Sequence, residues 1–537
     1  MATRSGSDRA QFETIDWDAV EPTGGVLTRR SWLFLLSVAA ILLLLLYDVF
    51  VAAPDPLFHN VGLQQGVQDP FTWDVRGIDW VFMLSLLVFG FYIVAPLVDD
   101  MARTKRYAAE LRKNKSATFA LGYLVCFFVF GVVGTIIVGR PSTDVSATSQ
   151  PPVSFATPLG RIDLFTLLVL LGVTLLGSWV LLAKLDRDRE LAAIAPITGA
   201  IARFGLVSLL ISTPLAVLFS VFPIAPLTLA AGAGVLAGLV AVAAWAVRTN
   251  LGLGSETLRG LAVVGGAFAV LFVAGFALVQ TVLYGFLGFD PLATGVVATS
   301  CEGAAAVSGG CYGSWAEPLG TNRYGKSMVK LVFDGMRIAL QVALISSVLI
   351  VPLATLTGTV AGYVGGIVDD LLMSYVDIQQ TVPAIVVYMI TVHVFGRSLF
   401  VLVLVFGLLS WGGAARLVRS EVLQRREEDY ITAAESAGAG KTRIMLHHVL
   451  PNVSNTVLTS VTRQIPQLIL AEAAIAFLNL NDIMLISWGE TVNISLKFLP
   501  DGWWMSTIPV VFLAVTVLSF SVLGDALRDV LDPRGGA

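Results

Sequence analysis

Residues Trp32 to Leu46 read WLFLLSVAAILLLLL, an apolar run that only Ser37 interrupts. A strand of a transmembrane barrel alternates polar and apolar side chains, and this run shows no such alternation. Lipid offers no hydrogen bonds to the backbone, so a segment that is apolar on every side satisfies its own N–H and C=O groups as a helix. The run therefore predicts a membrane-spanning α-helix.

The composition of the whole chain supports the same reading. Hydrophobic residues make up 56% of the 537 positions and charged residues 13%, whereas soluble domains carry about 25% charged residues. The net charge of -4 does not favour nucleic acid. A span needs about 20 mostly apolar residues, which predicts an all-α, polytopic transmembrane helical protein with about 12 spans. The predicted spans lie near 32–52, 79–98, 117–138, 163–183, 201–222, 225–247, 259–288, 336–357, 367–393, 398–411, 453–478 and 505–525.

The distribution of Lys and Arg predicts the orientation. Most of the 34 basic residues fall on one side of the membrane when the N-terminal segment 1–31 is placed in the cytoplasm. The basic linker 99–115 and the loop 412–452 share that side only if the number of spans is even. The first apolar run is too long and too far along the chain for a cleaved signal peptide. We therefore expect a multi-pass protein of the plasma (inner) membrane with both termini cytoplasmic.

The longest segment predicted on the outer side, 289–330, contains two of the three cysteines. Cys301 and Cys311 enclose a short stretch of Gly, Ala and Ser. Thiols outside the cytoplasm tend to pair, which makes a disulfide one possibility. Two free, partly buried thiols are the alternative.

The loop from Trp411 to Asn452 is the longest polar break in the second half of the chain. Its pattern predicts a short helix that carries small residues, ends at Gly438 as a C-cap and is followed by a new helix with Pro451 in its first turn. Small residues allow a helix to approach another surface closely. The loop is therefore interpreted as a docking element for a soluble partner, with an ordinary connecting hairpin as the alternative.

One part of this loop resembles the end of a phosphate-binding loop. Residues 438–442 read GAGKT, but Glu435 stands where that motif requires glycine, and no apolar strand precedes it. We therefore expect no cofactor in this chain. If ATP drives the protein, ATP and Mg²⁺ bind to another subunit.

The spacing of the loop residues resembles the coupling loop of ABC-importer permeases, written EAA-x3-G-x9-I-x-LP. Thr432-Ala433-Ala434, Gly438 and Leu450-Pro451 match it, although Thr432 replaces the usual Glu and His448 stands at the Ile position. His448 is typical of the dipeptide, oligopeptide and nickel importer permeases. Further blocks resemble that branch over about 259–537, and they comprise residues 318–321, 335–340, 361–366, 415–419, 470–473, 487–489 and 523–529. Glu317 departs from the family pattern, which usually has His there.

The resemblance implies a C-terminal permease core of about six helices over 259–537, with 32–258 as an additional N-terminal transmembrane region. It implies a permease subunit of an ATP-driven importer for di- or oligopeptides or a related small solute, not an enzyme. The implied partners are a second homologous permease, two ATPases whose hydrolysis is coupled to alternating access, and an extracytoplasmic binding protein. The residues implied in ATPase coupling are Arg416, Arg419, Tyr430, Thr432, Ala433, Ala434, Glu435, Gly438, His448, Leu450 and Pro451.

Polar residues within the predicted spans are candidates for the translocation path, because ionisable groups in lipid face a cavity or a partner. They are Arg463, Gln464, Gln467, Glu472 and Asp377. Arg463 and Glu472 are about half a turn apart around an ideal helix and are not expected to pair directly. The alternatives are a structural salt bridge to another helix for Arg463 and a snorkelling or capping role for Asp377.

Two other classes of function were weighed. An ATP-independent carrier or channel needs no docking loop of this kind. An intramembrane enzyme would carry a motif such as His-Glu-x-x-His or Gly-x-Ser-x-Gly, and neither occurs in the sequence.

Overall fold

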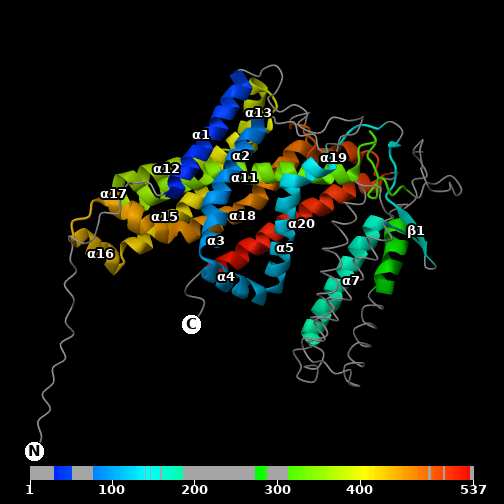
Figure 1. Ribbon diagram of the computed structural model, residues 1–537, viewed down its shortest axis with the longest axis horizontal. Helices are drawn as coiled ribbons and strands as arrows, with labels where there is room; N and C mark the ends of the chain where they lie inside the picture. The colour runs from blue at the N-terminus through cyan, green and yellow to red at the C-terminus, as the bar shows by residue number, and fades with distance from the viewer. Residues whose placement is uncertain are drawn as a thin grey trace, which may run out of the picture.

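The longest helix of the computed structural model, α11 (Met328–Val364), packs against helices from both halves of the chain. The structure describes residues 29–50, 77–139, 141–144, 147–157, 160–185, 272–286, 313–481, 485–499 and 502–531. Figure 1 shows α11 running from the side of strand β1 (Ser154–Thr157) to the side of α12 (Gly366–Thr381) and α17 (Lys441–Ile444). The core of the molecule forms around α11.

Helices dominate the described chain, which confirms the predicted all-α transmembrane fold. The N-terminal elements are α1 (Arg29–Phe50), α2 (Gly77–Phe89), η1 (Gly90–Val94), α3 (Ala95–Asp99), α4 (Met101–Lys113), α5 (Lys115–Val129), η2 (Phe130–Gly134), α6 (Thr135–Val138), β1, β2 (Gly160–Asp163), α7 (Leu164–Leu185) and η4 (Val279–Phe286). The C-terminal elements are α11, α12, α13 (Ala384–Phe395), α14 (Leu399–Leu409), α15 (Gly412–Arg426), α16 (Asp429–Ser436), α17, η5 (Met445–Val449), α18 (Leu450–Phe477), α19 (Trp488–Leu496) and α20 (Trp503–Leu531). The two strands pair antiparallel as a hairpin.

Six helices within the described residues are long and apolar enough to cross a membrane, and the pair α12–α13, bent by 75°, makes a seventh candidate. The predicted count of about 12 is not confirmed, and the predicted spans 201–222 and 225–247 lie outside the described residues. Some boundaries differ from the sequence-based expectation. Helix α11 begins at Met328, before the start of the span predicted at 336–357. The span predicted at 398–411 continues as helix through Arg426, because Val418 and Val422 of α15 are fully buried against α11.

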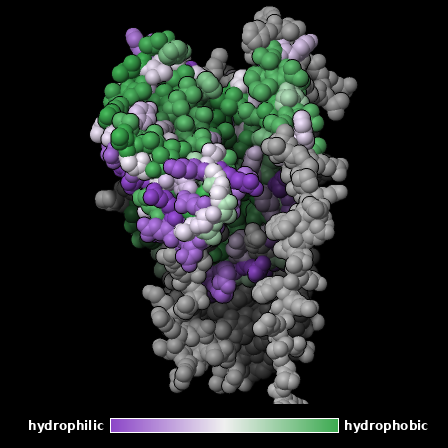
Figure 2. Space-filling model, turned by 90° about the vertical axis from the view of Figure 1, so that its left-hand side faces the viewer, coloured by the Kyte–Doolittle hydropathy of each residue, from purple (hydrophilic) through white to green (hydrophobic). Residues whose placement is uncertain are grey.

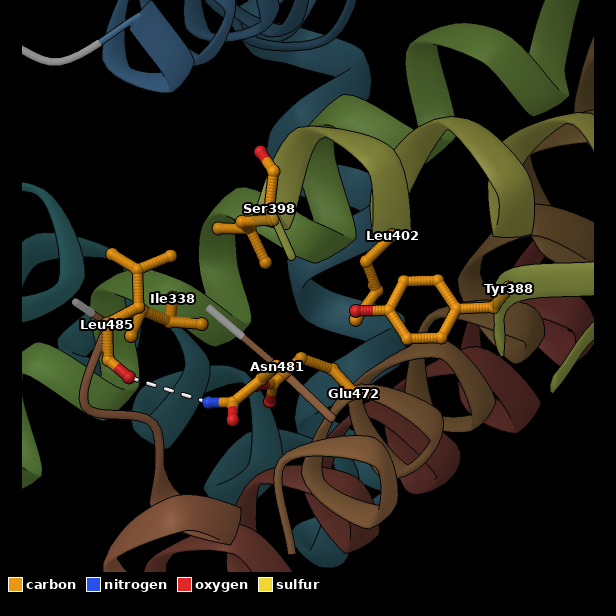
Figure 3. A pocket seen from close by; sticks show the side chains of 8 residues that line it. Ile338, Tyr388, Ser398, Leu402, Glu472, Asn481 and Leu485 are labelled. Carbon is orange, nitrogen blue, oxygen red and sulfur yellow. Dashed lines mark hydrogen bonds between the residues drawn. The ribbon is translucent and has the colours of Figure 1, made fainter. Parts of the chain in front are cut away.

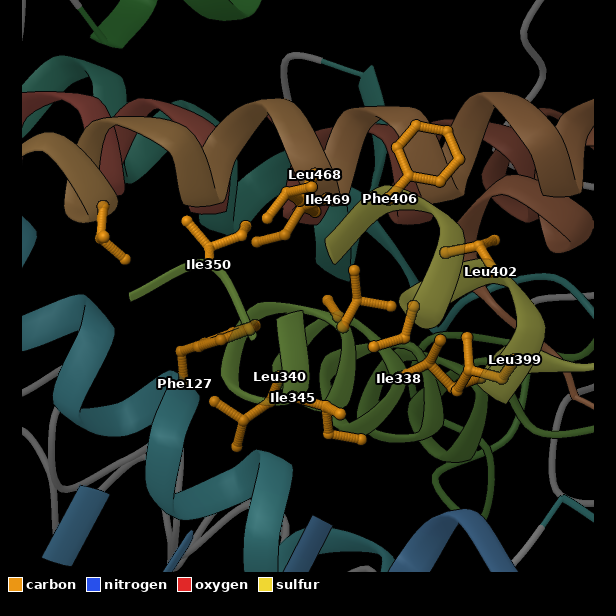
Figure 4. Close-up of a cluster of buried hydrophobic side chains, with 14 of the residues drawn as sticks. Phe127, Ile338, Leu340, Ile345, Ile350, Leu399, Leu402, Phe406, Leu468 and Ile469 are labelled. Carbon is orange, nitrogen blue, oxygen red and sulfur yellow. The ribbon is translucent and has the colours of Figure 1, made fainter. Parts of the chain in front are cut away.

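The main hydrophobic cluster joins side chains from both halves of the chain (Figure 4). Phe127 of α5 is 1% exposed, and its ring centroid lies 6.0 Å from that of Phe520 on α20. The Tyr123 hydroxyl lies 2.8 Å from the Thr516 hydroxyl, also on α20. Helices α5 and α6, which belong to the predicted N-terminal region 32–258, therefore share one core with the C-terminal half. The domain boundary near 258 stays a prediction.

At one end of the bundle, the segment after α6 forms backbone hydrogen bonds with the turn that precedes α11. The Val153 N–H donates to the Pro318 carbonyl at 3.2 Å, and the Thr321 N–H donates to the Gln150 carbonyl at 2.8 Å. Gly320 has φ 76°, and a Cβ there would lie 2.4 Å from the Gln150 oxygen, so the turn accepts only glycine at this position. These contacts fix where α11 begins.

Glu317 lies in the same turn. Burial raises the pKa of its carboxyl above the ordinary 4.5, while the Ser327 hydroxyl and the charge of Lys330 act in the opposite direction. The cysteine pair Cys301 and Cys311 lies outside the described residues, so the disulfide stays a prediction.

Candidate functional site

Helix α16 ends at Ser436, and Gly438 is the left-handed residue that terminates it, as the sequence predicted. Gly438 has φ 81°, its N–H donates to the Glu435 carbonyl at 2.9 Å, and the Ala439 N–H donates to the Ala434 carbonyl at 3.0 Å. This pair of bonds is the Schellman arrangement, in which a left-handed residue satisfies the last carbonyls of a helix. The chain then turns directly into α17, so residues 438–442 connect two helices instead of a strand and a helix.

Two buried isoleucines fasten this helical loop to the bundle. Ile431 of α16 is 1% exposed and Ile444 of α17 is fully buried. Thr432, Ala433 and Gly438 are exposed, and a Cβ on Gly438 would meet no atom within 4 Å. Figure 2 views this end of the molecule, where hydrophilic side chains gather beside a broad apolar surface. The loop is therefore held from beneath while its small residues stay open to a partner.

The remaining predicted loop residues meet where α16 faces the start of α18. Pro451 lies in the first turn of α18, as predicted. Asn452 Nδ2 donates to the His448 carbonyl at 2.7 Å and to the Tyr430 hydroxyl at 3.3 Å. The ring centroids of Tyr430 and His448 lie 6.5 Å apart. Tyr430 and His448, which lie far apart along the loop, are thus brought together in the folded protein.

Two glycines of α11 allow the backbones of α11 and α15 to approach each other closely. A Cβ at Gly358 would lie 2.5 Å from the Ala415 carbonyl oxygen, and one at Gly362 would lie 2.9 Å from the Arg419 oxygen. Glycines four positions apart line one face of a helix and allow this close approach. The α11–α15 pair is therefore a tightly packed unit.

Two arginines of α15 form ion pairs with α12. Arg419 donates to both carboxylate oxygens of Asp369, with an N–O distance of 2.5 Å. Arg416 donates to Asp377. The sequence predicted either a path-lining role or a snorkelling or capping role for Asp377, and it did not indicate either ion pair. Acids in an apolar helix require a counter-charge, which was the available signal, but the pattern did not say which arginine supplies it.

A side-chain hydrogen bond also joins α16 to the end of α11. The Tyr363 hydroxyl donates to Glu435 at 3.0 Å, and Arg426 donates to the Tyr363 backbone carbonyl at 3.2 Å. Sequence reasoning did not single out Tyr363. These contacts join α16 and α15 to the end of α11.

The predicted path residues of α18 are divided between two faces of the helix. Arg463 and Gln467 are exposed, in line with Leu470. Arg463 Nε lies 3.9 Å from an Asp525 oxygen of α20, which is the kind of structural partner that was weighed as the alternative. Gln464 donates to the Ser410 carbonyl. The path-lining role of these residues stays a prediction.

Glu472 lies on the buried side of α18 and is 4% exposed. As expected, it does not pair with Arg463. Figure 3 shows it lining a small pocket with Tyr388 and Asn481. Its carboxyl meets the Ser487 hydroxyl, and the Tyr388 hydroxyl donates to the Leu480 carbonyl at 3.0 Å.

A bundle of membrane-spanning helices with a helical loop exposed at one end defines a polytopic membrane protein. Residues 354–535 match the family of binding-protein-dependent transport system inner membrane components. The oligopeptide transport system permease protein OppC of Haemophilus influenzae is 32% identical over 217 residues, which are 40% of this chain and 70% of the relative. OppC of Bacillus subtilis is 30% identical over 217 residues, 40% of this chain and 71% of the relative. The dipeptide transport system permease protein DppC of Lactococcus lactis is 34% identical over 220 residues, 40% of this chain and 63% of the relative. The chain belongs to this family of transport permeases.

Proposed function

We propose that this chain is the permease subunit of an ATP-driven importer of di- and oligopeptides. The relatives are named for the transport of these compounds. The observation that carries the proposal is the loop α16–α17, whose exposed small residues lie above two buried isoleucine anchors. This is the surface on which a partner ATPase docks.

The contacts around the loop support a route for coupling. When the ATPases close on ATP, α16 is displaced and pulls on α11 through the Tyr363–Glu435 hydrogen bond. Because α15 is packed against α11, the ion pairs of Arg416 and Arg419 carry the displacement into α12. Helix α12 continues into α13 across the 75° bend, so its motion changes which side of the path is open. ATP and Mg²⁺ act in the partner subunits.

The proposed assembly contains a second homologous permease, two ATPases and an extracytoplasmic binding protein. The orientation follows from charge. Helix α4 exposes Lys105, Arg106 and Arg112, and Leu111 anchors it to the C-terminal end of α20 beside Ala526. This is the end of the bundle to which α16 and α17 belong. Two basic segments at one end support a cytoplasmic location for both.

The experiment is to purify the complex from its native host and identify the subunits that accompany the chain. Ala433→Trp places a bulky side chain on the exposed face of α16, and we expect it to abolish co-purification of the ATPases. Ala316→Trp is the matched control, since Ala316 is exposed in the turn before α11 at the opposite end. Normal ATPase recovery with Ala433→Trp would contradict docking at this site.

The cargo is tested separately by uptake into vesicles that contain the purified complex. We expect labelled di- and oligopeptides to accumulate in the presence of ATP and binding protein and to compete with one another. Accumulation of a nickel chelate or a sugar without accumulation of peptides would refute the peptide assignment and leave the coupling site intact.

A further inference from the structure

A charged network lies in the apolar part of the bundle, remote from the coupling loop. Arg337 of α11 is 7% exposed and Asp79 of α2 is 3% exposed. Arg337 Nη2 donates to Asp79 Oδ1 at 2.5 Å, and Gln341 Nε2 donates to the same oxygen at 2.8 Å. Arg337 Nη1 donates to the Thr135 hydroxyl at 3.2 Å. The Asp79 carboxylate therefore joins α2 to α11, and the Arg337 guanidinium joins α11 to α6.

The position of this network means that breaking its ion pair should strongly lower the stability of the folded protein. Arg337 lies nine residues into α11, about 13 Å from its first residue at 1.5 Å per residue, within an apolar span. A guanidinium that is shielded from water requires a counter-charge, and leaving it unpaired is strongly destabilising. Asp79 supplies that charge from a helix that begins before the family match at residue 354.

Apolar contacts also hold α2 in place. Phe82 belongs to the main hydrophobic cluster, and Ile78, Val81 and Leu86 pack against that cluster. The ring of Phe89 stacks on that of Phe128 in α5, with centroids 5.2 Å apart. The buried residues of α2 are Asp79, Trp80, Phe82 and Ser85, while much of the span Gly77–Asp99 remains at least partly exposed. Trp80 Nε1 donates to Asp48 at 2.8 Å, which adds α1 to the same connection. The attachment of α2 to the core therefore combines this apolar packing with one buried ion pair to α11.

We propose that Asp79 is the positioning counter-ion of Arg337, and that α2 is an integral brace of the permease core. The brace holds the half of α11 nearest β1, whereas the coupling loop acts on the other half through Tyr363. Part of the N-terminal region thus works as a fixed strut that keeps α11 in position while its opposite end is displaced.

The test measures how tightly α2 packs against the core of the full-length protein, through the accessibility of a thiol at position 85. Ser85→Cys is a near-isosteric change at a site that is 2% exposed and bonds only to its own helix at Phe82. Cys126, Cys301 and Cys311 are replaced by alanine, and maleimide labelling of the new thiol is followed over time. We expect slow labelling with Asp79 intact, and labelling at least about tenfold faster with Asp79→Asn or Arg337→Gln, because each leaves a buried group without its partner.

The double variant Asp79→Asn/Arg337→Gln removes both charges, so neither residue is left as a buried ion without a counter-charge. We expect its labelling rate and thermal unfolding midpoint to return close to those of the parent protein. The control is Asp99→Asn, which removes an exposed ion pair. In that pair the Arg30 side chain is 40% exposed and the Asp99 side chain is 66% exposed. That change should alter neither readout.

Slow labelling in Asp79→Asn, or a double variant that labels as fast as the single variants, would overturn the proposal. If a single variant cannot be purified, recovery of the double variant supports the pairing and its loss contradicts it. No readout involves transport, so the result is independent of the cargo and of ATP coupling.

Discussion

Replacing Gly358 by alanine should uncouple ATP hydrolysis from uptake. The added Cβ would lie 2.5 Å from the Ala415 carbonyl oxygen and 2.7 Å from Val418 Cβ, whereas ordinary contact begins at 3.4 Å, so α15 must move away by about 0.9 Å. Overpacking of this kind costs about 1–3 kcal/mol, and the better helix propensity of alanine returns about 0.5–1 kcal/mol. The net loss of stability is therefore at most about 2.5 kcal/mol.

The assay compares ATP hydrolysis with peptide uptake in vesicles that contain the complete complex. We expect hydrolysis to persist, because the exposed face of α16 is unchanged, and uptake per ATP to fall, because the shift of α15 disturbs the ion pairs with α12. The thermal unfolding midpoint should fall as well. Gly413→Ala on the facing helix α15 is the control, since its Cβ would meet only a Gln380 atom at 3.8 Å. A Gly358→Ala complex with parental midpoint and parental uptake per ATP would refute the close-packing argument.

Three further predictions concern other residues. Gly438→Ala should destabilise the loop by about 1–2 kcal/mol, because φ of 81° is left-handed, and ATPase recovery should fall while Gly440→Ala has little effect. Arg419→Ala should reduce uptake more than Arg419→Ala combined with Asp369→Asn, because the single change leaves a carboxylate of 12% exposure unpaired; equal losses would contradict this. Glu317→Gln should flatten the pH dependence of the unfolding midpoint. Since the folded-state pKa is raised, the contribution of Glu317 to stability is greatest at low pH and is lost as the pH rises from 4.5 through the raised value. An unchanged pH profile in the variant would show that Glu317 does not contribute.

Local features of the coupling loop could be predicted from the sequence. The C-cap at Gly438 and the helix start at Pro451 depend on the backbone preferences of single residues, and both are confirmed. The ion pair of Arg419 with Asp369 could not be predicted, because the two residues are 50 positions apart and only the packing of α15 on α12 brings them together.

The same limit applies to the N-terminal helices. Hydropathy predicted α5 as a span but could not indicate that Phe127 packs between Trp488 and Phe520. An apolar residue that faces lipid and one that faces a neighbouring helix look the same in the sequence, since both environments are apolar. The Asp79 carboxylate was also overlooked, because its partner Arg337 is 258 positions away.

The turn that precedes α11, which is hydrogen-bonded to the segment after α6, lies next to the point where the chain enters α7. Strand β2 ends at Asp163, and the Leu164 N–H donates to the Val153 carbonyl at 2.7 Å, while a Cβ on Gly313 would lie 2.5 Å from the Pro151 carbonyl oxygen. The chain therefore leaves and rejoins the bundle at one place. The entropy cost of closing a loop rises only logarithmically with its length, and segments with neighbouring ends are the ones that tolerate insertion. The junction acts as a graft point, where the polypeptide can gain or lose length without moving the helices that carry out transport.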